Sequence, residues 1–223
     1  VSVDGDTAIV GAYGKAGYTG AAYVFVRSGT TWSQQAKLIA SDSATNDYFG
    51  GSVVVLGDTA IVGAPNKNLA TGAAYVFVRA GTTWSQQAKL TAGDAATGDQ
   101  FGESLSMDGD TAVVGACNKS SETGAAYVFV RSGTTWSEQA KLTASDASAG
   151  DRFGISVSVD ASTAIVGAYM KSGSTGAAYV FVRSGTIWSE QAKLTASDAT
   201  ALDRFGYSVC VASDSAIVTA LTE

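Results

Sequence analysis

The chain contains no histidine, a single proline and only two cysteines among its 223 residues. Cys117 and Cys210 are poor candidates for a catalytic nucleophile, because no histidine is present to act as their base. A disulfide framework needs paired, recurring cysteines, whereas these two stand at different positions of the repeating pattern described below. We predict two free thiols that act as small apolar residues, with a single bridge between repeats as the alternative.

Long apolar runs and clusters of basic residues are missing as well. The longest apolar runs, such as residues 21–26, are far too short to cross a bilayer. The net charge is -6, the isoelectric point is about 4.6, and lysine and arginine are spaced singly along the chain. No phosphate-binding loop, zinc spacing, catalytic triad or dinucleotide fingerprint occurs. We therefore expect no nucleic-acid partner, no membrane insertion and no enzymatic activity.

What the sequence does contain is an exact period. Tryptophan occurs at positions 32, 84, 136 and 188, each 52 residues after the last, and the segment AAYVFVRSGTTWSQQAKL of residues 21–38 returns in the same register with one or two changes each time. A period near 50 residues is typical of propellers, in which each unit buries its apolar faces against its neighbours. We predict an all-β fold, a β-propeller of four-stranded antiparallel blades, with residues 1–223 as one domain holding four repeats and half of a fifth.

Each repeat carries four short apolar segments that predict strands, in the first repeat residues 1–3, 7–12, 22–27 and 32–38. The second and third are apolar on both faces and should be covered on both sides. In the fourth, simple alternation places Trp32, Gln34, Ala36 and Leu38 on one face. Strands one and two, and three and four, join through tight turns, whereas the other two connections are long. Alternate connections of such a sheet lie at the same end, so both long loops should share one face.

Two short motifs point to a family. Phe49-Gly50 is followed by Val62-Gly63-Ala64-Pro65, and near copies recur at one and two periods further on. The whole chain resembles FG-GAP repeat proteins, which include the integrin α-subunit propeller. The resemblance implies a β-propeller used for adhesion or recognition outside the cell.

The sequence departs from the integrin pattern at the calcium-binding loop between strands one and two. Here that connection is only three residues, Asp4-Gly5-Asp6 in the first repeat. Three residues offer too few oxygens for a six- to eight-coordinate ion. We expect no cofactor and little dependence on calcium at this turn.

Pairs of aspartates recur in the loop that leads from one repeat to the next. They are Asp42 with Asp47, Asp94 with Asp99, Asp146 with Asp151, and Asp198 with Asp203. Paired carboxylates suit acid–base catalysis or metal binding. Since catalytic sites are usually single and asymmetric, a fourfold pair favours caps of the loop backbone, with a weak cation site as the first alternative and catalysis as the last.

Aromatic columns give a second set of candidates. The four tryptophans suit sugar-stacking platforms, but packing between blades buries more of such a side chain and is the interpretation we favour. The tyrosines at 23, 75, 127 and 179 lie in mid-strand, where core packing is expected.

The loop between strands two and three varies most between repeats, reading YGKAGYT, PNKNLAT, CNKSSET and YMKSGST. Recognition is encoded in variable loops on a repeated scaffold, although exposed loops also simply drift. The loop includes the sequon Asn118-Lys119-Ser120. The candidate ligand-binding residues are Tyr13, Lys15, Tyr18, Asn66, Lys67, Asn118, Lys119, Tyr169 and Lys171.

These observations favour a non-enzymatic extracellular or cell-surface module that binds a protein or glycan through its long-loop face. The alternatives are a structural array within a larger assembly and, far behind, a propeller hydrolase or lyase. The residues from Val209 onward match the first two strands of a repeat only. Because such a half blade exposes a strand edge, we expect the chain to be part of a longer one or to pair with another chain.

Overall fold

The computed structural model describes residues 1–221, and almost all of its regular structure is β. Each repeat forms one antiparallel sheet in which consecutive strands are neighbours. The sheets are β1 (Ser2–Asp4), β2 (Thr7–Gly11), β3 (Ala22–Ser28) and β4 (Thr31–Leu38); β5 (Val53–Leu56), β6 (Thr59–Ala64), β7 (Ala73–Ala80) and β8 (Thr83–Leu90); β9 (Ser104–Asp108), β10 (Thr111–Ala116), β11 (Ala125–Ser132) and β12 (Thr135–Leu142); β13 (Ser156–Asp160), β14 (Thr163–Ala168), β15 (Ala177–Ser184) and β16 (Ile187–Leu194). A last pair, β17 (Ser208–Ala212) and β18 (Ser215–Thr219), forms a two-stranded sheet. The predicted fold of four-stranded blades is confirmed.

The fourth strand differs from the prediction. In the first repeat Val24 lies opposite Ala36, but Phe25 lies opposite Gln34, so Gln35 is an extra residue that bulges from β4. A bulge exchanges the faces of the residues on its two sides. Simple alternation was therefore wrong here: Trp32 and Gln34 share a face with Lys37, and Ala36 lies on the other face. The same bulge recurs in β8 and β16.

The chain packs as two compact units, the first holding Val1–Leu105 with Gly133–Trp136, the second Ser106–Ser132 and the residues from Ser137 onward. In the first unit, Val24, Leu38 and Phe49 of the first repeat pack with Tyr75 and Phe77 of the second. The equivalent residues of the third and fourth repeats form the core of the second unit. All six residues of β6 are buried, as expected for a strand covered on both faces. Each core therefore lies between one repeat and the next.

The glycines of the two motifs meet at these junctions. The Gly50 N–H donates to the Gly63 carbonyl at 2.9 Å. Gly50 has φ of 90°, a conformation that side chains disfavour, and a Cβ on Gly63 would lie 2.1 Å from the Gly102 carbonyl oxygen. Only glycine permits this approach of backbone to backbone, which explains why Phe-Gly and Gly-Ala recur together.

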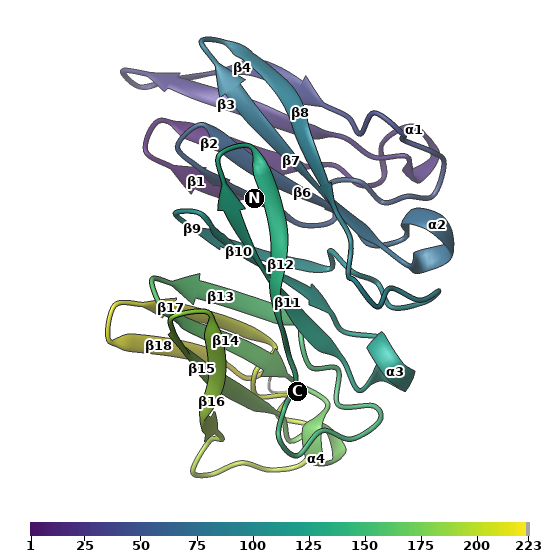
Figure 1. The fold of residues 1–223 in the computed structure, drawn as a ribbon, viewed down its shortest axis with the longest axis vertical. Coiled ribbons are helices and arrows are strands. Elements are labelled where there is room, and N and C mark those ends of the chain that lie inside the picture. The colour runs from purple at the N-terminus through teal and green to yellow at the C-terminus, as the bar shows by residue number, and fades with distance from the viewer. Residues whose placement is uncertain (222–223) are drawn as a thin grey trace. The chain divides into compact units, whose positions relative to one another are not determined.

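The long loops lie at one end of the sheets in each unit, and the β1–β2 and β13–β14 turns lie at the other, as predicted (Figure 1). The loops between strands two and three carry the short turns α1 (Lys15–Tyr18), α2 (Lys67–Ala70), α3 (Lys119–Glu122) and α4 (Lys171–Ser174). They meet the loops between repeats directly, because the Tyr48 N–H donates to the Tyr18 carbonyl at 2.9 Å and the Arg152 N–H to the Glu122 carbonyl at 2.7 Å. We call this end the loop face.

Candidate functional site

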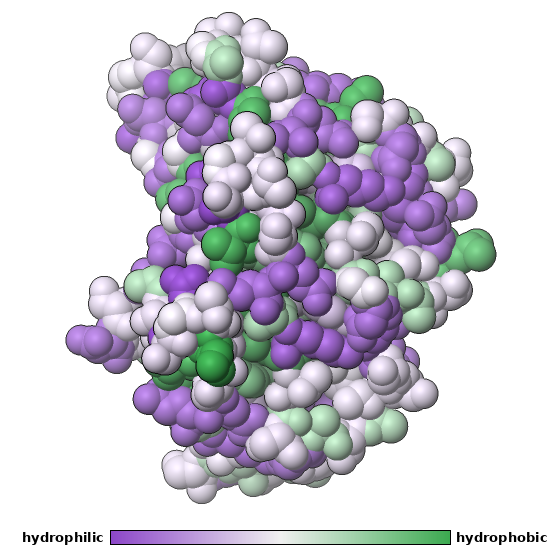
Figure 2. Space-filling view, viewed as in Figure 1, coloured by the Kyte–Doolittle hydropathy of each residue, from purple (hydrophilic) through white to green (hydrophobic). Residues whose placement is uncertain are grey.

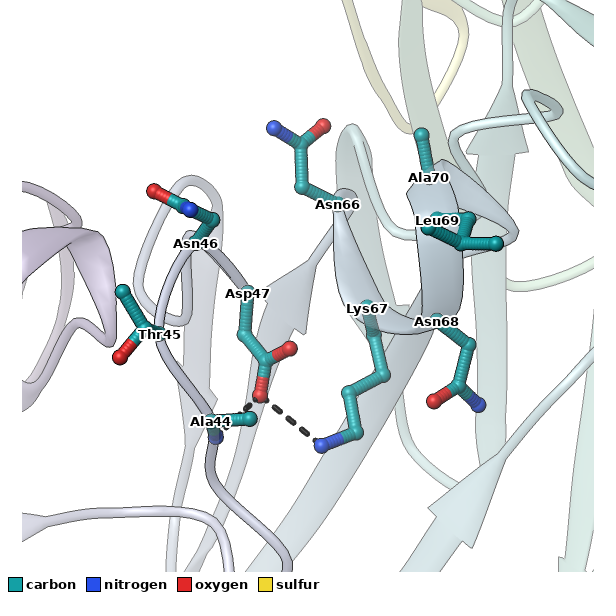
Figure 3. Close-up of a pocket in the computed structure, with 9 residues that line it drawn as sticks. All are labelled: Ala44, Thr45, Asn46, Asp47, Asn66, Lys67, Asn68, Leu69 and Ala70. Atoms are coloured by element: carbon teal, nitrogen blue, oxygen red, sulfur yellow. Dashed lines mark hydrogen bonds and ion pairs between the residues drawn. The ribbon is translucent and has the colours of Figure 1, made fainter.

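The lysine of each variable loop is the first predicted ligand-binding residue to consider. Lys67 begins α2, and its side chain is only 6% exposed. It points down between two loops toward Asp47 (Figure 3). The Lys67 Nζ lies 2.9 Å from Asp47 Oδ2 and also donates to the Asp42 carbonyl. Lys171 makes the equivalent contacts to Asp151 and Asp146 in the second unit.

These lysines therefore connect one repeat to the loop before it. The buried amino group of Lys67 contacts oxygens of a loop about 20 residues earlier in the chain. Lys119 is buried in the same way, whereas Lys15, in the first repeat, is exposed. In three of the four positions, the side chain predicted to contact a ligand has its ammonium group turned into the protein.

The two aspartates of each pair make different contacts. The second aspartate of each pair caps its own loop: Asp47 Oδ2 accepts the Ala44 N–H at 2.6 Å, and the equivalent bonds to Asp99, Asp151 and Asp203 are 2.7, 2.7 and 2.6 Å. The first aspartate binds the following repeat. Asp42 accepts the Tyr75 hydroxyl at 2.7 Å and pairs with Lys89 at 2.6 Å.

Electrostatics at this junction is balanced. Burial opposes ionisation of Asp42, but hydrogen bonds from Lys89 and Tyr75 and the charges of Lys89 and Lys67 outweigh it and lower its pKa. Burial and the Asp42 carboxylate together raise the pKa of the Tyr75 hydroxyl. Two ammonium groups thus face two carboxylates, and no net negative charge is left to attract a divalent cation.

The aspartates of the short turn between strands one and two also have partners within the protein. Asp6 pairs with Arg27 at 2.7 Å, and Asp4 accepts the Gly57 N–H at 2.7 Å, so the short turn is occupied with protein contacts. Among residues 1–221, no group of three or more histidine, cysteine, aspartate or glutamate side chains could hold a metal ion. Cys117 and Cys210 are both free thiols, as predicted.

A cluster of three tyrosines is the most distinctive feature of the loop face in the first unit. Tyr13, Tyr18 and Tyr48 have ring centroids 5.1 to 6.5 Å apart. Tyr13 and Tyr18 are 51% and 47% exposed. Their rings are held against each other while a large part of each stays in contact with solvent. We call this group the tyrosine cluster.

Two hollows adjoin the cluster. One has a volume of about 370 Å³ and is lined by Tyr13, Tyr48, Gly51, Pro65, Asn66, Gln100 and Glu103. The other, of about 530 Å³, shares Asn66 and has the Asp47–Lys67 pair in its wall, with Thr45, Asn46 and Asn68 around it (Figure 3). Aromatic rings, amides and a carboxylate therefore lie together on one surface, which suits a ligand with both apolar and hydroxyl-bearing faces.

Left-handed backbone occurs at this place, as it does at the equivalent loops of the other repeats. Tyr48 has φ of 58°, and Asn68, Leu69 and Ala70 in α2 have φ of 52°, 58° and 60°. The elements α1 to α4 are thus left-handed turns, a conformation costing roughly 1–2 kcal/mol for each residue that is not glycine. The Tyr48 turn directs a bulky ring onto the loop face, and strain of this kind is often found at binding sites.

The second unit presents different chemistry at the equivalent positions. Arg152 replaces Tyr48 and donates from its guanidinium to the Tyr169 hydroxyl at 3.0 Å and to Glu122 at 3.2 Å. Its pKa is raised, chiefly by the hydrogen bond to Glu122. The Tyr169 ring lies 5.5 Å from that of Tyr207. The scaffold therefore carries an aromatic surface in one unit and a charged one in the other.

The other predicted sites are placed as follows. Asn118 is partly exposed and its side-chain oxygen accepts from the Cys117 thiol at 3.6 Å. Trp84 and Trp188 are half-buried, and their ring N–H groups donate to Gln35 and Gln139 of the preceding repeat at 2.9 and 3.0 Å. Trp32 is 41% exposed. The visible surface of the molecule mixes hydrophilic and near-neutral residues, with separate small hydrophobic patches (Figure 2).

Sequence reasoning missed Tyr48, Gln100 and Glu103. The position before each Phe-Gly reads Tyr, Gln, Arg and Arg in the four interblade loops, at residues 48, 100, 152 and 204. This variation within an otherwise constant segment was the available signal.

Four-stranded antiparallel blades, repeated every 52 residues and joined by loops at a common end, define a repeat protein of the β-propeller type. The family model described as FG-GAP repeat matches residues 32–77, 84–129, 136–181 and 188–223. The chain therefore belongs to the FG-GAP repeat family. A search of curated proteins found no match to this chain.

Proposed function

We propose that the chain is a non-enzymatic recognition module that acts outside the cell or at its surface and binds a protein or glycan through the loop face. The tyrosine cluster carries the proposal. It presents aromatic faces to solvent beside two hollows with amide and carboxylate linings.

A glycan is the ligand that this surface fits best. The apolar face of a sugar ring stacks on an exposed aromatic ring, and its hydroxyl groups exchange hydrogen bonds with amides and carboxylates. Asn66, Gln100 and Glu103 stand in position to supply those bonds. Held rings bind with little loss of conformational freedom, so the packing of the three tyrosines favours affinity.

Membership in the FG-GAP repeat family supports the extracellular assignment, since adhesion-type and propeller proteins carry these repeats. In the described part of the chain, no helix is both long enough and apolar enough to cross a membrane. The absence of histidine and the capping role of the aspartates support a module without catalytic activity.

A glycan array with the labelled full chain tests the proposal. The wild-type chain should bind a defined set of glycans, and Tyr48→Ala should weaken that binding about tenfold, the effect of losing about 1.4 kcal/mol of ring contact. Trp32→Ala is the control, because Trp32 is an exposed aromatic residue of the β3–β4 hairpin, away from the loop face.

Three results bear on the proposal: the first and third would contradict it, and the second would decide for a protein over a glycan. Binding lost with Trp32→Ala but kept with Tyr48→Ala would transfer the site to the tryptophan column. Capture of a protein from the native source, with no glycan bound, would leave a protein as the ligand. Turnover of an arrayed polysaccharide would make the chain an enzyme.

A further inference from the structure

The larger hollow on the loop face, of about 530 Å³, is rich in amide side chains. The whole chain has four asparagines, and three of them, Asn46, Asn66 and Asn68, line this hollow. Asn46 belongs to the interblade loop on one wall, whereas Asn66 and Asn68 stand at the start of α2 on the other (Figure 3). Both walls of the hollow therefore carry amide groups.

The fold of these turns does not require the amides. The position of Asn46 is glycine in the second and third interblade loops, and the position of Asn68 is serine in the third and fourth repeats. These counterparts, which have the same positive φ, are Gly98, Gly150, Ser120 and Ser172. The scaffold thus forms the same left-handed turns with smaller side chains, and the asparagines at this junction point to a role in binding.

The charges that line the two hollows leave no cation to bind an anionic ligand. Lys67 and Asp47 lie 2.9 Å apart and pair with each other. The third charged lining residue is Glu103, in the smaller hollow. A carboxylate accepts hydrogen bonds from hydroxyl groups but repels a sulfate or a uronate, and an amide both donates and accepts. The lining therefore suits an uncharged ligand with many hydroxyl groups.

The two hollows adjoin each other, because Asn66 lines both. The walls of the larger one are held together, since the Asn66 N–H donates to the Asp47 carbonyl at 3.2 Å in addition to the Lys67–Asp47 pair. Ligand sites of roughly 300–1,000 Å³ enclose most of a drug-sized molecule. With volumes of about 370 and 530 Å³, each hollow has room for at least one sugar residue.

We propose that the two hollows are neighbouring subsites for an uncharged oligosaccharide, an inference that rests on the glycan binding proposed above. One sugar residue stacks on Tyr48 in the smaller hollow. The next occupies the larger hollow and exchanges hydrogen bonds with Asn46 and Asn68, while Asn66 binds hydroxyl groups beside the linkage. A single sugar makes only the first set of contacts.

The test measures how affinity depends on the length of the ligand. The labelled full chain is titrated with neutral oligomers of glucose, mannose and N-acetylglucosamine, each of one to four residues, and with uronic acid oligomers of the same lengths. For the neutral sugar that binds, we expect affinity to rise at least tenfold from one residue to three and to change little beyond, because both hollows are then filled. The uronic acid oligomers should bind at least tenfold more weakly.

Two substitutions copied from other repeats locate the second subsite and keep the turns intact. Asn46→Gly and Asn68→Ser should each weaken binding of the trisaccharide about fivefold, the effect of losing one hydrogen bond, and should leave binding of the single sugar unchanged. Tyr48→Ala should weaken binding of both. Ser172→Ala, at the position of Asn68 in the fourth repeat, is the matched control and should change neither.

A single sugar that binds through Tyr48 as tightly as the trisaccharide would overturn the second subsite and keep the glycan site. Length dependence that Asn46→Gly and Asn68→Ser leave unchanged would do the same. Uronic acid oligomers that bind more tightly than neutral ones would overturn the choice of an uncharged ligand. Absence of binding to glycans of every length would overturn the proposed function itself, and the two subsites with it.

Discussion

At the scale of single residues, the left-handed turns hold residues other than glycine in a backbone conformation that their side chains disfavour. Leu69 has φ of 58° although it is 82% exposed, while the first and fourth repeats carry glycine here, with φ of 64° at Gly17 and 70° at Gly173. The leucine gains little from packing, so the strain has no compensation in its own contacts.

Leu69→Gly should therefore stabilise the first unit, by about 1 kcal/mol, because glycine adopts this conformation without steric cost. Leu69→Ala is the control and should change stability far less, since alanine keeps the Cβ. Urea denaturation measures both. A glycine variant less stable than the alanine variant would show that the leucine side chain contributes more than its exposure indicates.

The buried lysine is the second prediction at this scale. Lys67→Met removes the cationic partner of the Asp47 carboxylate, whose side chain is only 6% exposed. We therefore expect the free energy of unfolding to fall by about 3–5 kcal/mol. Lys15→Met changes the equivalent but exposed side chain of the first repeat and should be nearly neutral. If both variants unfold at the same urea concentration, the buried pair has no net role in stability.

The third prediction at this scale concerns the titration of Asp146. Burial opposes its ionisation, but hydrogen bonds from Lys193 and Tyr179 and the charges of Lys171 and Lys193 outweigh this and lower its pKa to about 2. The unfolded chain binds this proton at a pKa of about 4, so the contribution to stability is complete above that pH and is lost as pH falls through about 2. The urea midpoint of Asp146→Asn should decline less steeply than that of wild type between these pH values, and equal slopes would contradict the assignment.

At the scale of elements, the fourth strand of each repeat holds the junction from outside. Trp84 packs on the core of the first unit and donates to Gln35, whose position in a bulge turns it toward the next repeat. Trp84→Ala should lower the free energy of unfolding by about 3 kcal/mol, which is at the low end for truncation of a tryptophan because the ring is only half-buried. Trp32→Ala should lower it clearly less. Equal costs, measured by chemical denaturation, would mean that the contact between repeats is unimportant.

The strands and their order could be predicted from sequence because period and alternation are local signals. The bulge was not predicted, because the three consecutive polar residues from Ser33 to Gln35, which interrupt the alternation, fit an exposed regular strand as well as a bulge. Nor could the burial of Lys67 be predicted, because its partners come from a loop that only the fold brings beside it. In the candidate site, Tyr13, Tyr18 and Asn66 were found from loop variation, while Tyr48 and Gln100 were missed because they stand next to the invariant part of the repeat.

At the scale of the molecule, the junctions bear on metal dependence. Lys67 and Lys171 each supply a fixed positive charge among oxygens that otherwise resemble a cation site. We expect a chelator to leave the melting temperature nearly unchanged, and calorimetry with calcium to give no tight sites. Several tight sites at Asp4 and Asp6 or their counterparts would contradict this, and metal binding confined to the interblade aspartates would favour the weak-cation alternative.

The junction contacts also bear on how such a protein changes over generations. The second repeat meets the first through the same lysine, tyrosine and aspartate contacts by which the fourth meets the third. Because these two junctions are built alike, in-frame duplication or loss of one 52-residue unit recreates an existing contact instead of requiring a new one. The loop residues are free of that constraint and can diverge copy by copy. A gene of this kind can therefore vary the number of its binding surfaces and the chemistry of each one separately.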